Sequence, residues 1–152
     1  MYHYVESGLP NVYLLNGYRE VATAEGVGIA IEDVEGLHWA IAENLVERES
    51  ALTGDAVRFI RKLLELTQIK LGAFLGVEDQ TVRNWERAGG EPVPTQADRG
   101  VRLVFRDITR RVASPLPELI ERVAIERDSS QEIPFRYEPR GSEHWIPERR
   151  AA

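Results

Sequence analysis

A run of hydrogen-bonding side chains lies in GVEDQTVRNWER, residues 76 to 87. Val82 and Trp85 are three residues apart, so they share one edge of a helix. The other positions carry carboxylate, amide, hydroxyl and guanidinium groups, in the order Asp79, Gln80, Thr81, Arg83 and Asn84. Arginine matches O6 and N7 of guanine, glutamine or asparagine matches N6 and N7 of adenine, and aspartate accepts from the cytosine amino group. These five residues therefore have the chemistry needed to read base edges.

The segments around this helix are suited to hold it in that position. A preceding helix is predicted from about Gln68 to Leu75, and Gly76 ends it because glycine adopts a positive φ at little cost. Val77 then anchors the turn. A helix in the major groove must be fastened to its own protein by a narrow apolar edge, here Val82 and Trp85. Its spacing makes Trp85 a core residue rather than a residue that stacks on bases.

This arrangement is typical of a known family. TQIKLGAFLGVEDQTVRNWERAG resembles the helix-turn-helix of the Xre/Cro class of phage repressors, through Thr67-Gln68, Leu71, Leu75-Gly76-Val77 and Trp85-Glu86. The likeness covers about residues 52 to 106. The order of a β-rich first part followed by this motif also resembles the MqsA-type antitoxins and related transcriptional regulators. Those antitoxins bind zinc through N-terminal cysteines, which this chain lacks, so a metal-free variant is implied.

The resemblance implies a second set of contacts, to the phosphate backbone. Such contacts fix the register on DNA without reading sequence, and positive charges and helix N-termini make them. The implied residues are Thr67, Gln68, Lys70 and Arg87. The alternative for this set and for the base-reading set is that they are ordinary exposed polar residues.

Two positions depart from the family pattern. Gly72 replaces the usual alanine, which costs roughly 1 kcal/mol of helix stability but permits close helix packing. Glu78 replaces the usual Ser or Thr cap, and with Asp79 it brings two negative charges near the DNA backbone. Asp79 has an alternative role as the helix cap. This acidic pair is the strongest sequence argument against tight DNA binding.

A further basic feature is expected on the next helix, which starts at Pro94 or Thr95 and stops before Pro115. Its predicted buried stripe is Ala97, Val101, Val104, Phe105 and Ile108. The outer face then holds Arg99, Arg102, Arg106 and Arg110, with Asp98 and Asp107 partly neutralising them. Such a face is suited to flank DNA or meet an acidic partner, and the alternative is a solvated surface.

The first block of the chain predicts a small sheet and one helix. Apolar runs at 12–15 and 27–31 alternate with the glycine turns Asn16-Gly17 and 25–28. Asp33 then caps a helix that runs to about Glu49, with an apolar stripe of Val34, Leu37, Ile41 and Leu45. In the second block, Thr53 is a good cap for a helix whose inward stripe is Val57, Ile60, Leu63 and Leu64.

The third block predicts a short helix from about Leu116 to Arg127 and then extended chain. Ile133, Phe135 and Tyr137 alternate as in a strand, and Trp145-Ile146 is a candidate return strand. Pro134, Pro139 and Pro147 favour an edge strand or an extended arm. Three roles stay open for this tail: completing the N-terminal sheet, wrapping a second copy, or holding a partner protein.

The predicted fold class is therefore α+β, with a small β-rich N-terminal part carrying one helix, an all-α helix-turn-helix domain of four to five helices, and a C-terminal helix with an extended tail. The predicted domains are residues 1–50 for dimerisation or partner binding, 51–113 for DNA binding, and 114–152 for the C-terminal helix and arm. At 152 residues with 43% hydrophobic and 29% charged residues, this is ordinary globular composition.

Charge and cysteine usage limit the partners. The net charge is −6, yet residues 53–111 hold 11 Arg and Lys against 8 Asp and Glu, whereas residues 1–52 hold 2 against 9. A mildly basic middle thus lies between acidic ends, which keeps a polyanionic partner possible. The absence of cysteine excludes disulfides and thiolate zinc sites and fits a reducing cytosol. With neither a signal peptide nor a membrane span, the expected location is cytoplasmic.

Enzyme chemistry finds little support, and neither a cofactor nor a metal is expected. His3, His38 and His144 are scattered without metal-binding spacing, and Gly26-Val27-Gly28 is too short for a dinucleotide fingerprint. The expected function is a sequence-specific double-stranded DNA-binding transcriptional regulator, a repressor acting as a homodimer on an inverted repeat. The alternatives are an antitoxin whose main role is to bind a toxin protein, or a protein-interaction module that uses the helix-turn-helix as a scaffold.

Overall fold

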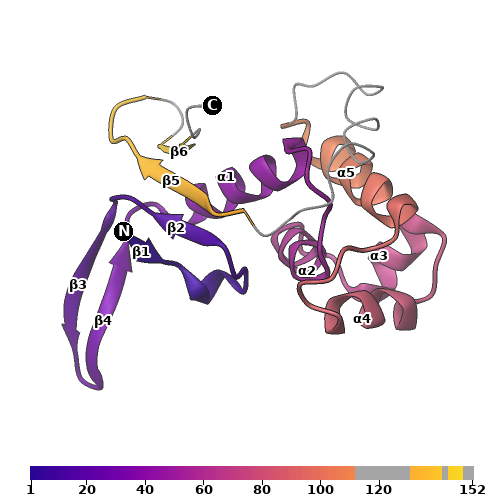
Figure 1. The fold of residues 1–152 in the computed structure, drawn as a ribbon, viewed down its shortest axis with the longest axis horizontal. Coiled ribbons are helices and arrows are strands. Elements are labelled where there is room, and N and C mark those ends of the chain that lie inside the picture. Colours follow the sequence, from indigo (N-terminus) through magenta and orange to yellow (C-terminus); the bar gives the residue numbers. More distant parts are fainter. Residues whose placement is uncertain (112–130, 142–143, 149–152) are drawn as a thin grey trace. The chain divides into compact units, whose positions relative to one another are not determined.

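The computed structural model describes residues 1–111, 131–141 and 144–148. These form an α+β fold whose helices and strands are shown in Figure 1. The chain divides into two compact units, Met1–Ile41 with Gln131–Ala152, and Ala42–Ser130. These bounds differ from the three expected segments, because the C-terminal strands group with the first block of the chain. The helix expected over Leu116 to Arg127 lies outside the described residues.

The first unit contains a four-stranded sheet of order β1-β2-β5-β6. Its strands are β1 (Tyr2–His3), β2 (Val12–Leu14), β5 (Ile133–Tyr137) and β6 (Trp145–Pro147), and a short 3₁₀ helix, η1 (Val5–Ser7), follows β1. β5 pairs parallel to β2, and the other pairs are antiparallel. The predicted strands at 12–15 and 133–137 and the return at Trp145 are confirmed. Of the three roles open to the tail, the structure shows completion of the sheet.

The position of β5 corrects the expectation of an edge strand. β5 lies between β2 and β6, although it contains Pro134. The pairing of β5 with β6 ends where Phe135 lies opposite Pro147, so Pro134 lies beyond the paired residues. The Pro134 carbonyl accepts from Glu148 N. The proline therefore occupies a position where no donor is needed for pairing with β6.

A separate two-stranded hairpin follows β2. β3 (Tyr18–Thr23) and β4 (Gly26–Ile31) pair antiparallel with Tyr18 opposite Ile31, and none of their residues is buried. In Figure 1 the hairpin extends away from β5 and β6. Gly17, at φ +74°, connects β2 to it, and a Cβ there would lie 2.7 Å from the Trp145 ring. Glycine is required at this position by both the backbone and the aromatic packing.

Helix α1 (Val34–Glu47) begins where expected and continues into the second unit. The Asp33 carboxylate accepts from Gly36 N at 3.1 Å, which confirms Asp33 as its cap. Leu37, Ile41 and Leu45 are buried as predicted. Val34, the first residue of α1, is 44% exposed and does not belong to the buried stripe.

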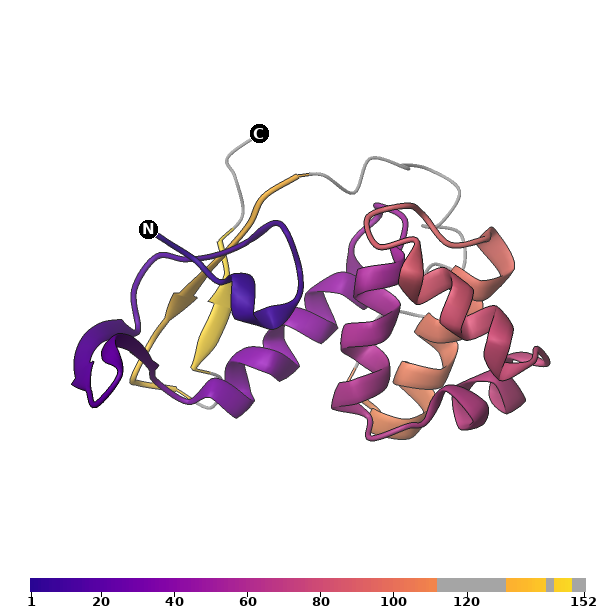
Figure 2. The same ribbon diagram turned by 90° about the horizontal axis from the view of Figure 1, so that it is seen from below.

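The second unit contains α2 (Gly54–Leu63), α3 (Gln68–Leu75), α4 (Asp79–Arg87) and α5 (Thr95–Thr109), which surround a common core (Figures 1 and 2). Thr53 caps α2, with its hydroxyl accepting from Ala56 N. The core contains members of every one of these helices, namely Val57, Ile60, Leu71, Val82, Val101 and Phe105. No helix of the described residues is long and apolar enough to cross a membrane.

Candidate nucleic-acid interface

Helices α3 and α4 are joined by a tight glycine turn, as predicted. The Thr67 hydroxyl accepts from Lys70 N at 3.0 Å and so caps α3. Gly76 ends α3 at φ +71°, with its N–H donating to the Gly72 carbonyl. Val77 N donates to the same carbonyl at 2.9 Å. A left-handed residue at this point satisfies the last carbonyls of α3 and reverses the chain within three residues.

Helix α4 starts without a side-chain cap. Glu78 occupies the cap position in an extended conformation, and its carboxylate makes no capping hydrogen bond. Asp79 is the first helical residue, so it does not serve as the cap that the sequence left open. The backbone N–H groups of the first turn are therefore not satisfied by a capping side chain, and the negative charges of Glu78 and Asp79 favour this helix end electrostatically.

The inner edge of α4 consists of Val82 and Glu86, with Trp85 beside them. Val82 is fully buried and Glu86 is 8% exposed, whereas Trp85 is half-buried. The Trp85 backbone also forms part of the packing, because a Cβ on Gly54 would lie only 1.9 Å from the Trp85 carbonyl oxygen. The first residue of α2 thus contacts the backbone of α4 directly, and only glycine permits this approach.

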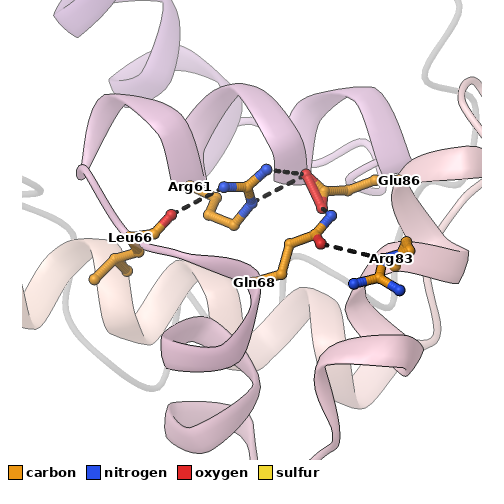
Figure 3. A network of polar contacts seen from close by, with 5 residues as sticks. All are labelled: Arg61, Leu66, Gln68, Arg83 and Glu86. Carbon is orange, nitrogen blue, oxygen red and sulfur yellow. Dashed lines mark hydrogen bonds and ion pairs between the residues drawn. The ribbon is translucent and has the colours of Figure 1, made fainter.

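Glu86 is the centre of a polar network that joins three helices (Figure 3). Its Oε1 accepts from Arg61 Nη2 at 2.7 Å and from Arg61 Nε at 3.0 Å, and its Oε2 accepts from Gln68 Nε2 at 2.7 Å. Arg61 also donates to the Leu66 carbonyl at 2.9 Å. The carboxylate is thereby paired and hydrogen-bonded, which is the condition for burying a charge without a large penalty.

The network continues from the protein interior to the exposed face of α4. Gln68 Oε1 accepts from Arg83 Nε at 3.4 Å, as Figure 3 shows. Arg83 Nη1 donates to Gln80 Oε1 at 3.0 Å, and Arg83 Nη2 lies 3.5 Å from Asp79 Oδ2. Gln80 Nε2 in turn donates to Asn84 Oδ1 at 2.9 Å. Four of the five predicted base-reading residues therefore contact one another.

The predicted site residues lie on α3 and α4, apart from Thr67, which precedes α3 as its cap. The base-reading set is on α4, where no member is buried: Asp79, Gln80, Thr81, Arg83 and Asn84. In the phosphate set, Thr67, Lys70 and Arg87 are exposed. Gln68 is half-buried, and its amide binds Glu86 at one end and Arg83 at the other.

Residues to which the sequence assigned no contact also organise this region. Arg61 and Glu86 form an ion pair 25 positions apart, for which no local sequence pattern exists. Asp55, at the start of α2, is partly buried; burial raises the pKa of its carboxyl, and Arg58 opposes that effect. Ile69 and Phe74 on α3 are 69% and 54% exposed, so this helix also presents apolar side chains to solvent.

The expected arginine face of α5 needs correction. Arg102 is 1% exposed and paired with Asp98, so it does not lie on the outer face. It donates to the carbonyls of Val46, Arg48 and Ser50, which hold it in the interior. Arg99 and Arg106 are half-buried and Arg110 is exposed. Ile108, predicted to be buried, is 47% exposed, and it lies next to the C-terminal end of α5 at Thr109.

In the described part of the chain, no group of three or more His, Asp or Glu residues is arranged to hold a metal ion. A comparison with protein-family models found no match, and comparisons with curated proteins and with solved structures found none either.

Proposed function

We propose that this protein is a sequence-specific double-stranded DNA-binding transcriptional regulator of the Xre/Cro helix-turn-helix class. The observation that carries the proposal is the exposed polar face of α4, which is fastened along its opposite edge by Val82 and Glu86. A helix held in this way can enter the major groove and present donors and acceptors to base edges. Exposed Lys70 and Arg87 near the same helices are suited to bind phosphates.

The proposed regulator is a repressor that binds an inverted repeat as a homodimer. A two-fold dimer places two recognition helices in successive major grooves about 34 Å apart and doubles the interface area. The protein would act in the cytoplasm, without a cofactor and without enzymatic activity.

The test uses fluorescence anisotropy with the purified full chain. The protein is titrated against the DNA upstream of its own gene and against a scrambled duplex, at several salt concentrations, together with the double variant Arg83→Ala, Asn84→Ala. Tight binding to the upstream duplex alone, lost in the variant, is the expected result. Equally weak binding to both duplexes, unchanged in the variant, would show that α3 and α4 form only a scaffold.

A second candidate function is binding of a basic protein, as in an antitoxin. Residues 1–41 contain one basic residue, Arg19, against the acids Glu6, Glu20, Glu25, Glu32, Asp33 and Glu35. The β3–β4 hairpin in this segment has no buried residue, and Val27 near its tip is 75% exposed. Co-purification with the product of a neighbouring gene, lost after Val27→Lys, would favour this function over the first.

A further inference from the structure

Arg83 has its guanidinium donors divided between the protein and the open face of α4. A guanidinium carries five N–H donors. Nε points to Gln68, one N–H of Nη1 to Gln80, and Nη2 lies beside Asp79. Within the described residues, one N–H on Nη1 and one on Nη2 therefore remain unused. Two such parallel donors form the fork that pairs with O6 and N7 of guanine.

The orientation of Gln68 is fixed by its other partner. Its amide nitrogen donates to the buried Glu86 carboxylate at 2.7 Å, so its amide oxygen must point toward Arg83. The reversed amide would bring an oxygen against a carboxylate and an N–H against a guanidinium. Because Glu86 is itself held by Arg61, Arg83 receives its position from the helix core through Gln68.

Asp79 supplies an acceptor beside this fork. Its Oδ2 lies 3.5 Å from Arg83 Nη2, and both side chains are 42% exposed. In a guanine–cytosine pair, guanine O6 and the cytosine amino nitrogen are hydrogen-bonded to each other, about 2.9 Å apart. An arginine donor and an aspartate acceptor at nearly the same separation match these two atoms simultaneously.

We infer that the Asp79–Arg83 pair, seated on Gln68, reads a single guanine–cytosine pair, with Arg83 on guanine and Asp79 on the cytosine amino group; this inference rests on the proposed DNA-binding function. An adenine–thymine pair fails twice at this position. The adenine amino group places a donor against the arginine, and thymine O4 places an acceptor against the aspartate. Gln68 acts as a positioning residue, in place of the phosphate contact expected from the sequence.

The inference is tested with the full chain by selection from a library of random duplexes, followed by competition binding of single-base variants of the selected site. The wild-type protein is expected to require one guanine–cytosine pair in each half-site and to lose about tenfold or more in affinity when that pair becomes adenine–thymine. Arg83→Ala should abolish this preference. Asp79→Asn should reduce it several-fold, because the carboxylate no longer opposes thymine O4.

Glu78→Gln is the matched control for Asp79→Asn. This substitution removes a negative charge at the residue next to Asp79, and Glu78 is not among the partners of Arg83. The variant should therefore bind all duplexes more tightly and keep the base preference of the wild type. Gln68→Ala should lower the preference for guanine while binding to random DNA stays as in the wild type. Replacing the selected guanine by 7-deazaguanine, which lacks N7, should weaken the wild-type protein but not Arg83→Ala.

The outcomes separate the two proposals. Selection of a defined site whose base preferences are the same in wild type, Arg83→Ala and Asp79→Asn would overturn this inference and leave the DNA-binding function standing. Failure of the wild-type protein to select any site at low salt would overturn both. A change in unfolding temperature that accounts for a variant's loss of preference would assign that residue to stability instead.

Discussion

The guanidinium of Arg102 lies 2.5 Å from the carboxylate of Asp98, one turn earlier on α5, and both side chains are 1% exposed. Asp98 also accepts from Leu52 N at 2.7 Å. Arg102 donates to the Val46 carbonyl at the end of α1 and to the Arg48 and Ser50 carbonyls in the segment that links α1 to α2. The pair therefore satisfies backbone groups that no helix or strand could satisfy, and it joins α5 to that linker.

Removing Arg102 should destabilise the second unit strongly. Arg102→Leu leaves the Asp98 carboxylate buried without its cation and three carbonyls without a donor, so we expect a loss of about 3–5 kcal/mol in the free energy of unfolding. Asp107→Ala, a change at an exposed residue of the same helix, should cost less than about 0.5 kcal/mol. Urea unfolding followed by circular dichroism measures both. A loss below 1 kcal/mol for Arg102→Leu would contradict the role assigned to the pair.

Gly54 should not tolerate a side chain. A Cβ at this residue would lie 1.9 Å from the Trp85 carbonyl oxygen, so Gly54→Ala must push α2 away from α4, at a cost of about 1–3 kcal/mol. Gly90 is the matched control, since a Cβ there meets nothing within 4 Å and its φ is not positive. Gly90→Ala should be neutral or stabilising by about 0.4–1 kcal/mol. Thermal unfolding of both variants would show whether the two glycines differ in this direction.

Glu86 should contribute to the stability of the second unit through its hydrogen-bonding partners rather than through its charge alone. Glu86→Ala leaves Arg61, whose side chain is 12% exposed, without its counter-ion, and we expect a loss of about 3–5 kcal/mol. Glu86→Gln retains the side-chain size and one acceptor, so it should cost less. Lys62→Ala, at an exposed neighbour of Arg61, should leave the urea midpoint nearly unchanged. Equal effects of the alanine and glutamine variants would argue against the hydrogen-bonded network.

Tyr4 and His38 should make stability depend on pH. The Tyr4 hydroxyl lies 2.8 Å from His38 Nε2, burial lowers the pKa of His38 below 6.5, and burial followed by Glu6 raises the pKa of Tyr4 above 10.0. The unfolded chain then binds a proton at His38 more readily than the folded chain, so stability should fall as pH drops through 6.5. It should also fall as pH rises through 10.0, where unfolded Tyr4 ionises first.

His38→Gln should flatten the acidic limb of that profile. The measurement is the urea midpoint between pH 5 and pH 8 for the wild type and the variant. NMR titration of the His38 ring gives the folded pKa directly. A His38 pKa at or above 6.5 in the folded protein would contradict the predicted direction.

Much of the second unit follows from local sequence. The cap at Thr53 and the helix end at Gly76 were predicted and confirmed, because each depends on backbone groups within four residues. The exposure of Gln80 and Asn84 follows from helical period once Val82 is assigned to the core. At Gly72 a Cβ would lie 2.6 Å from the Val77 carbonyl oxygen, so the close packing that glycine was expected to permit is present, and an alanine would not fit without movement of this turn.

The sequence by itself determined the α+β class, the order of the elements and the residues at helix ends, since these depend on neighbours along the chain. The tertiary structure alone decided that Arg102 is buried, that Gln68 binds Glu86 and Arg83, and that β5 pairs with β2. Periodicity assigns a polar residue to the surface by default, and only a partner brought close by folding makes its burial favourable. For Arg102 the carbonyl partners are 52 to 56 residues away, and for β5 the paired strand is separated by more than a hundred residues.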